Sequence, residues 1–173
     1  MGCELLFQSR LLTELLPAIV LPNIGGIIGA IITKEDVKIY ERLRKPSWSP
    51  PKWLFGPMWT TLYVLMGAAS LIVYKKGNGF TENSSACLPL MLYGSQLILN
   101  WAWSPLFFRA RKPGLALLDI GVLWINIAAC VVTFFKVDTT AGTLLLPYLA
   151  WVTLATALNY NLWKDNSNIQ KLK

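Results

Sequence analysis

The chain of 173 residues contains no histidine, so the commonest metal ligand and the usual acid–base side chain near neutral pH are both missing. Its three cysteines, Cys3, Cys87 and Cys130, lie far apart and match neither a zinc-ligand spacing nor a disulfide framework. There is also no glycine-rich phosphate loop and no nucleophile beside a base. We therefore expect no catalytic residues of the common types, no metal site and no bound cofactor.

Charged residues are also few, and the acidic ones are the scarcer kind. Nine Asp and Glu stand against sixteen Lys and Arg, which gives a net charge of +7. Hydrophobic residues make up 54% of the chain, and the mean hydropathy is +0.47. A soluble domain of this length cannot bury so much apolar surface, so the composition predicts a membrane protein. The basic residues lie between the apolar runs, which indicates membrane orientation and argues against nucleic-acid binding.

Five apolar runs of 19 to 23 residues divide the chain, and each is about long enough to cross a bilayer as a helix. The runs are continuous and do not alternate with a period of two, which favours helices over a barrel. We predict an all-α integral membrane protein, a five-transmembrane-helix bundle over 15–163, with an N-terminal arm over 1–14 and a tail over 164–173. The predicted spans are 15–33, 54–74, 86–108, 114–135 and 142–163.

Lysine and arginine are divided unequally between the two ends of this predicted bundle. The N-terminal arm, the second loop and the fourth loop together carry four: Arg10, Lys75, Lys76 and Lys136. The first loop, the third loop and the tail carry twelve: Lys34, Lys38, Arg42, Arg44, Lys45, Lys52, Arg109, Arg111, Lys112, Lys164, Lys171 and Lys173. Because basic loops favour the cytoplasmic side, the first loop, the third loop and the C-terminus are predicted to be cytoplasmic.

The first loop, residues 34–53, is the longest connection and predicts a short helix of its own. Val37, Tyr40 and Leu43 recur at helical spacing with charged residues between them, as in a helix lying on a surface. Such a helix would form a lid over the cytoplasmic mouth of the bundle or serve as a solvated connector. The spacing is compatible with both.

Small and polar residues inside the spans predict how the helices meet. Gly25 and Gly29 have GxxxG spacing, which favours close packing within the bundle over dimerisation. Gln96 and Asn100 lie four residues apart on one helix face, which should point inward. That face would line a ligand pocket or form interhelical hydrogen bonds. Asp119 is the one acid within the runs, and we expect an ion pair with the third loop ahead of a polar contact at the pocket.

Four stretches carry a resemblance to a known family. They are KPSWSPPKWLFGPMWTTLY (45–63), LNWAWSPLFF (99–108), LLPYLAWVTLATALNYNLW (145–163) and PNIGGIIGA (22–30). Together, in this order, they resemble the translocator protein family, also called tryptophan-rich sensory proteins or peripheral-type benzodiazepine receptors (TspO/MBR), in its eukaryotic form. The resemblance extends from about residue 17 to residue 166.

The resemblance implies a fold, ligands and a location. Members are five-helix bundles in membrane lipid that bind cholesterol, porphyrins such as protoporphyrin and haem, and isoquinoline or benzodiazepine drugs. In animals they lie mainly in the outer mitochondrial membrane; the endoplasmic reticulum is the alternative here. The implied pocket residues are Ala30, Trp59, Asn100, Trp103, Trp151 and Leu158. The implied sterol motif is Leu158, Tyr160 and Lys164, which also fits a weak cholesterol pattern.

Three classes of function follow. The favoured class is a receptor-like protein that binds sterols or tetrapyrroles and takes part in their transport or homeostasis. The alternatives are a porphyrin-degrading enzyme, whose matching tryptophans would be Trp59 and Trp151, and a stress-response membrane scaffold. Phe55 and Leu115 stand where the family usually has a smaller residue and a tryptophan, which argues against high-affinity drug binding. The glycines through which some members dimerise are replaced here, so a homodimer is left open.

Overall fold

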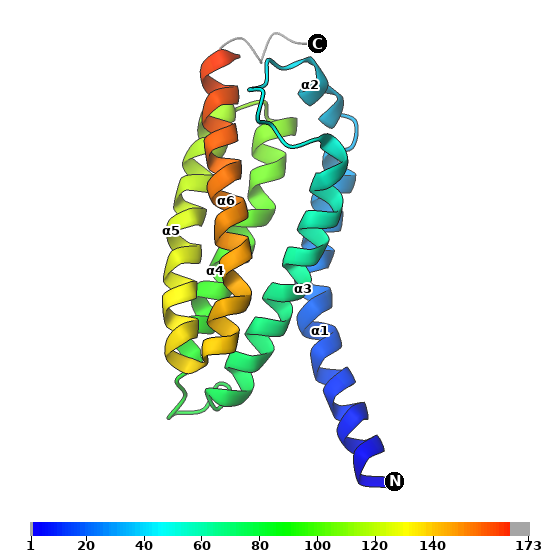
Figure 1. The fold of residues 1–173 in the computed structure, drawn as a ribbon, viewed down its shortest axis with the longest axis vertical. Helices are drawn as coiled ribbons and strands as arrows, with labels where there is room; N and C mark the ends of the chain where they lie inside the picture. Colours follow the sequence, from blue (N-terminus) through cyan, green and yellow to red (C-terminus); the bar gives the residue numbers. More distant parts are fainter. Residues whose placement is uncertain (1, 167–173) are drawn as a thin grey trace.

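The computed structural model describes the backbone of residues 2–166 and the side chains of residues 13–36 and 40–166. Within these residues the regular structure is helical and no strand occurs, so the prediction of an all-α chain is confirmed (Figure 1). The elements are α1 (Gly2–Thr33), α2 (Val37–Arg42), α3 (Lys52–Lys76), α4 (Cys87–Ser104), the π-helical turn η1 (Pro105–Arg109), α5 (Pro113–Val137) and α6 (Thr139–Asp165). Most of the predicted tail, residues 167–173, lies outside the described part.

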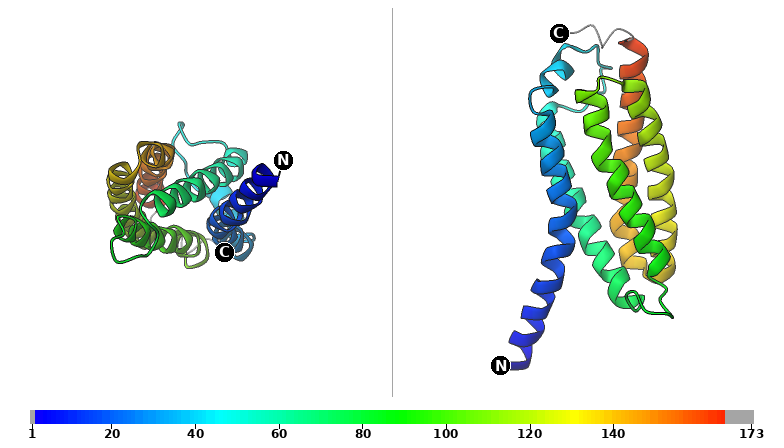
Figure 2. Two further views of the ribbon diagram at one scale, coloured as in Figure 1. Left: turned by 90° about the horizontal axis from the view of Figure 1, so that it is seen from below. Right: turned by 180° about the vertical axis from the view of Figure 1, so that it is seen from behind.

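The five long helices pack side by side into one bundle, which Figure 2 shows in an end-on view. Helix α1 packs on α3, α3 on α6, α6 on α5 and α5 on α4, and α4 returns to α1. Helix α1 begins at Gly2, so the residues predicted as an N-terminal arm continue this helix, and its first turns extend beyond the other helices (Figure 1). The ring of helices can therefore enclose a space that every long helix helps to line.

Four of the helical segments are long and apolar enough to cross a membrane: Thr13–Thr33, Lys52–Lys76, Pro113–Val137 and Thr139–Asp165. Helix α4, the remaining predicted span, has 18 residues and is long enough to cross. It is too polar to belong to this group, because it includes Gln96 and Asn100. Proline explains its early end, because Pro105 has no N–H to donate and the chain continues as a π-helical turn. The chain is a multi-pass integral membrane helical bundle.

The connections gather at the two ends of the bundle (Figure 1). The α1–α3 connection with α2, the α4–α5 connection and the end of α6 lie at one end, and the α3–α4 and α5–α6 connections lie at the other. The loops rich in Lys and Arg thus share one end of the bundle, which agrees with their predicted location on one side of the membrane. At the opposite end, Lys75 pairs with Glu14 and Lys76 pairs with Asp138. Both pairs link neighbouring helices across that end.

Glycine allows α1 to approach its neighbours closely. A Cβ at Gly67 in α3 would lie 2.7 Å from Ile19 Cα of α1, a backbone atom that cannot move aside easily. On α1, Gly25 faces the Trp101 ring and Gly26 faces the Tyr63 ring, with no room for a side chain. Gly25 and Gly26 therefore pack closely within the bundle, whereas a Cβ at Gly29 would meet only Ser104 Cβ, at 3.9 Å.

Candidate functional site

Two adjoining cavities lie between the helices. One has a volume of about 230 Å³ and extends toward the middle of the bundle from the half nearer α2, as far as Tyr63, Asn100 and Trp151; we call it the central cavity. The other, of about 290 Å³, lies toward α2 and is called the loop-side cavity. The residues that line both are Gly26, Ala30, Phe55, Trp59, Trp103, Ser104 and Ala155. Because these residues are shared, the two cavities adjoin, and we refer to them together as the hollow.

The predicted pocket residues all lie on the walls of this hollow. Ala30, Trp59 and Trp103 line both cavities, Asn100 and Trp151 line the central cavity, and Leu158 lines the loop-side cavity. They come from four helices: α1, α3, α4 and α6. Helical periodicity explains the contribution of α6, because Ala155, Leu158 and Leu162 follow Trp151 on one face.

Aromatic rings make up much of the wall. The Phe55 ring meets the Trp151 ring edge-on, with centroids 5.6 Å apart and planes at 69°. Trp103 stacks on Phe107 at 5.1 Å, and Trp59 lies 5.6 Å from the Tyr63 ring. Such a surface favours flat, apolar ligands, which gain affinity from buried area and from ring-to-ring contact.

The polar residues of α4 form a hydrogen-bond network across three helices. The Tyr63 hydroxyl donates to Asn100 Oδ1 at 2.7 Å, and Asn100 Nδ2 donates to the Tyr148 hydroxyl at 3.1 Å. Tyr148 in turn donates to Gln96 Oε1 at 2.8 Å. Of the two readings for this helix face, interhelical bonding therefore holds for Gln96. Asn100 has both roles: it lines the central cavity, and its amide forms interhelical hydrogen bonds with Tyr63 and Tyr148.

Trp101 and Trp151 line the central cavity, and their indole N–H groups are buried without a hydrogen-bond partner among the described residues. Trp103 differs, because its Nε1 donates to Asn159 Oδ1 at 2.9 Å. Because the nitrogens of Trp101 and Trp151 are buried, neither is open to the space of the central cavity. These two residues therefore contribute apolar surface to its wall.

Asp119 forms neither of the contacts predicted for it, which were an ion pair with the third loop and a polar contact at the pocket. Within the described part of the chain it forms no ion pair, and its Oδ2 is buried without a hydrogen-bond partner. Arg111 of the third loop lies instead 3.9 Å from Asp36. Asp119 also lies outside the lining of both cavities.

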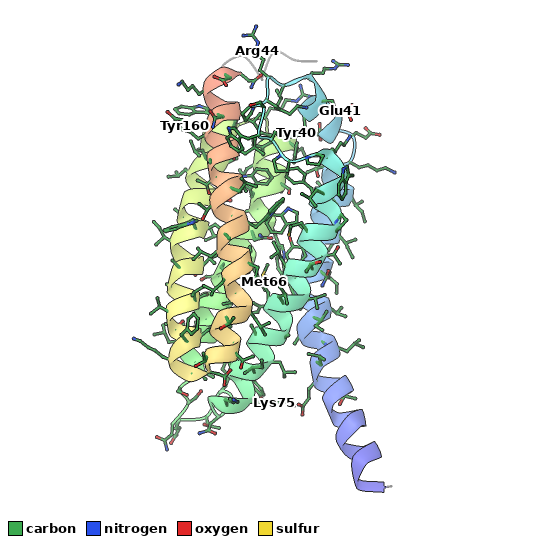
Figure 3. All side chains as sticks on the ribbon, in the orientation of Figure 1. Tyr40, Glu41, Arg44, Met66, Lys75 and Tyr160 are labelled. Atoms are coloured by element: carbon green, nitrogen blue, oxygen red, sulfur yellow. The ribbon has the colours of Figure 1, made fainter. Side chains whose placement is uncertain are left out.

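The residues of the sterol motif do not converge on one site. Leu158 is buried against the loop-side cavity, whereas Tyr160 is 47% exposed and packs its ring beside Trp163. Figure 3 shows Tyr160 on the outside of α6, and Lys164 is exposed one turn further on. Leu115, predicted to bear on drug binding, is also 48% exposed and lines neither cavity. A sterol held by Tyr160 and Lys164 would thus lie on the outer surface of the bundle.

The first loop covers the loop-side cavity. Tyr40 and Leu43 are buried, and Tyr40 contributes to the cavity wall. The side chain of Val37, the third residue of the predicted apolar face, lies outside the described residues. These contacts agree with a lid, because the loop packs its apolar side chains onto the bundle end.

Sequence reasoning missed the tyrosines that hold the network together. Tyr63 follows Trp59 by four residues and Tyr148 precedes Trp151 by three, so each shares a helix face with a predicted pocket residue. This spacing from a predicted pocket residue is the sequence signal that indicates an inward position for both tyrosines. Among the described residues, no cluster of three or more His, Cys, Asp or Glu side chains is arranged to hold a metal.

Comparison with known proteins agrees with these features. A sequence model of the TspO/MBR family matches residues 18–164. The chain is 47% identical over 146 residues to Translocator protein of Homo sapiens, which covers 84% of this chain and 85% of that protein. It is also 39% identical over 143 residues to Protein CrtK of Rhodobacter capsulatus, covering 82% of this chain and 86% of that protein. The chain belongs to the TspO/MBR family.

Proposed function

We propose that this protein binds cholesterol and porphyrins in the hollow between its helices and acts in sterol or tetrapyrrole transport or homeostasis. The observation that carries the proposal is the aromatic wall of the hollow, to which Trp59, Trp103 and Trp151 contribute. The apolar body of the ligand would pack against these rings, because buried area and ring-to-ring contact favour a flat ligand.

The membrane arrangement belongs to the same proposal. The chain crosses the membrane five times, with α4 as the most polar of the five spans. The basic loops and the C-terminus face the cytoplasm, which follows from the gathering of lysine and arginine at one end. Residence in the outer mitochondrial membrane is the location that the resemblance of the sequence to animal members of the family implies. Glycosylation at the sequon Asn83-Ser84-Ser85 would point instead to the endoplasmic reticulum.

Titration with protoporphyrin tests the binding proposal. Trp151→Leu removes one aromatic ring from the wall, so we expect protoporphyrin affinity to fall about tenfold, as for the loss of one aromatic contact. Trp163→Leu is the matched control, because Trp163 lies outside the lining of both cavities and its loss also removes one fluorophore. Equal affinity of Trp151→Leu and the parent chain would contradict the proposal.

A porphyrin-degrading enzyme is the second candidate, because Trp59 and Trp151 line the same cavity. Illumination of the protoporphyrin complex distinguishes the two functions. A degrading enzyme yields product that disappears in both Trp59→Phe and Trp151→Phe. A binding protein yields the same product with or without these substitutions, at the rate of free protoporphyrin.

A further inference from the structure

We infer that Phe55 is a specificity-determining partition that favours slender sterol-like ligands over broad tetrapyrrole plates. The inference rests on the proposed function and assigns a role to one residue of the cavity wall. It is carried by the position of the Phe55 ring between the two cavities and by the size of each cavity alone.

Phe55 connects the two cavities through its ring contacts. Its ring meets Trp151 of the central cavity at 5.6 Å and Tyr40 of the loop-side cavity at 6.2 Å. Both contacts are edge-on, so Phe55 is held from two sides. Tyr40 lines only the loop-side cavity and Trp151 only the central one. The Phe55 ring therefore stands where one cavity passes into the other.

The other aromatic residues shared by both cavities do not bridge them in this way. The described ring contacts of Trp103 are with Phe107 and Phe108, both on the loop-side cavity. Those of Trp59 are with Tyr63 and Tyr148, toward the central cavity and the network behind it. Phe55 is thus the side chain whose removal would most directly join the two spaces.

The volumes show why a partition matters. Pockets that hold drug-sized ligands measure about 300–1,000 Å³. The central cavity of about 230 Å³ falls below this range, and the loop-side cavity of about 290 Å³ is at its lower end. A sterol is a narrow strip of fused rings that can extend along both cavities past one ring edge. A porphyrin is a broad square plate, and Phe55 would lie in its plane.

Substitution of Phe55 tests the inference on the purified full chain in detergent micelles. The probes are dehydroergosterol, a fluorescent sterol followed by energy transfer from tryptophan, and protoporphyrin, followed by tryptophan quenching. Phe55→Leu should raise the affinity for protoporphyrin relative to dehydroergosterol about tenfold, as expected for a change of a few methylene groups in an apolar pocket. Phe55→Trp should lower the same ratio, which keeps the test valid if the smaller side chain prevents folding.

Phe108→Leu is the matched control, because Phe108 lines only the loop-side cavity. It enlarges one cavity without joining the two, so the affinity ratio should change less than about twofold. Binding of both probes by the parent chain, with the same ratio in Phe55→Leu and Phe108→Leu, would overturn the partition and leave the proposed function standing. Failure of the parent chain and all variants to bind either probe would overturn the proposed function and the partition with it.

Discussion

Asn166 at the end of α6 holds the first loop through both backbone groups of Arg44. The Arg44 N–H donates to Asn166 Oδ1 at 2.9 Å, and Asn166 Nδ2 donates to the Arg44 carbonyl at 3.1 Å. The same Nδ2 also lies 3.0 Å from the Leu162 carbonyl, which keeps the side chain aligned with its helix. The side-chain amide of Asn166 therefore attaches the first loop, residues 34–53, to the end of α6 beside the loop-side cavity.

Asn166→Ala should release this loop without unfolding the bundle. Two exposed hydrogen bonds are lost, worth together about 1 kcal/mol, so the Arg44 amide should exchange with deuterium about fivefold faster. Hydrogen exchange with peptide resolution measures the effect. Asn161→Ala is the control, because Asn161 Nδ2 donates within α6 to Ala157 O at 2.9 Å. Equal protection of the loop in both variants would show that Asn166 does not restrain it.

Gly67→Ala should destabilise the bundle by about 1–3 kcal/mol, the usual effect of overpacking. The new Cβ would meet the backbone of α1 near Ile19, so α1 and α3 would have to separate. Thermal denaturation in one detergent measures the change. Gly94→Ala is the control, because a Cβ there meets nothing within 4 Å and alanine should stabilise the helix by about 0.5–1 kcal/mol. Equal midpoints for the two variants would refute close packing at Gly67.

Much of this fold follows from the chain alone, because lipid requires long apolar helices. The apolar runs predict α3, α5 and α6 to within a few residues. The structure differs from these predicted ranges at two places, where a proline or polar residues modify the helix. Pro105 turns the last part of the third run into η1, and the more polar start of α1 continues the helix without an apolar signal.

The site is predictable only in part, for a related reason. Periodicity on α6 brings Trp151 and Leu158 to the hollow, because residues on one helix face share an environment. Contacts between residues distant in the chain have no such local signal. The bond between Arg44 and Asn166 spans 122 positions, and nothing in either neighbourhood predicts it. The outward placement of Tyr160 likewise depends on how α6 rotates against its neighbours.

Tyr148→Phe should weaken the hydrogen-bond network without creating a cavity. Its hydroxyl accepts from Asn100 and donates to Gln96, and both amides would keep a buried group unpaired. We expect the free energy of unfolding to fall by about 1–2 kcal/mol, between the soluble and membrane values for such bonds. Chemical or thermal denaturation measures it. Tyr160→Phe on the outer surface should change it by less than about 0.5 kcal/mol, and a similar loss there would count against the network.

Acid should separate α6 from α3 at the end opposite the lid. Asp138 accepts the Ala141 N–H at the start of α6 and pairs with Lys76, and the hydrogen bond from Lys76 lowers the pKa of this carboxyl below its ordinary value. Because the folded pKa is the lower one, this stabilisation is complete above the ordinary pKa of about 4 and is lost as the pH falls from there through the lower folded pKa. The thermal midpoint should therefore drop more between pH 5 and pH 3 for the parent chain than for Asp138→Asn, which cannot ionise. Asp165→Asn, at the exposed end of α6, should retain the parent's full drop. If Asp138→Asn falls as steeply as the parent chain, other carboxylates carry the acid sensitivity and this pair does not.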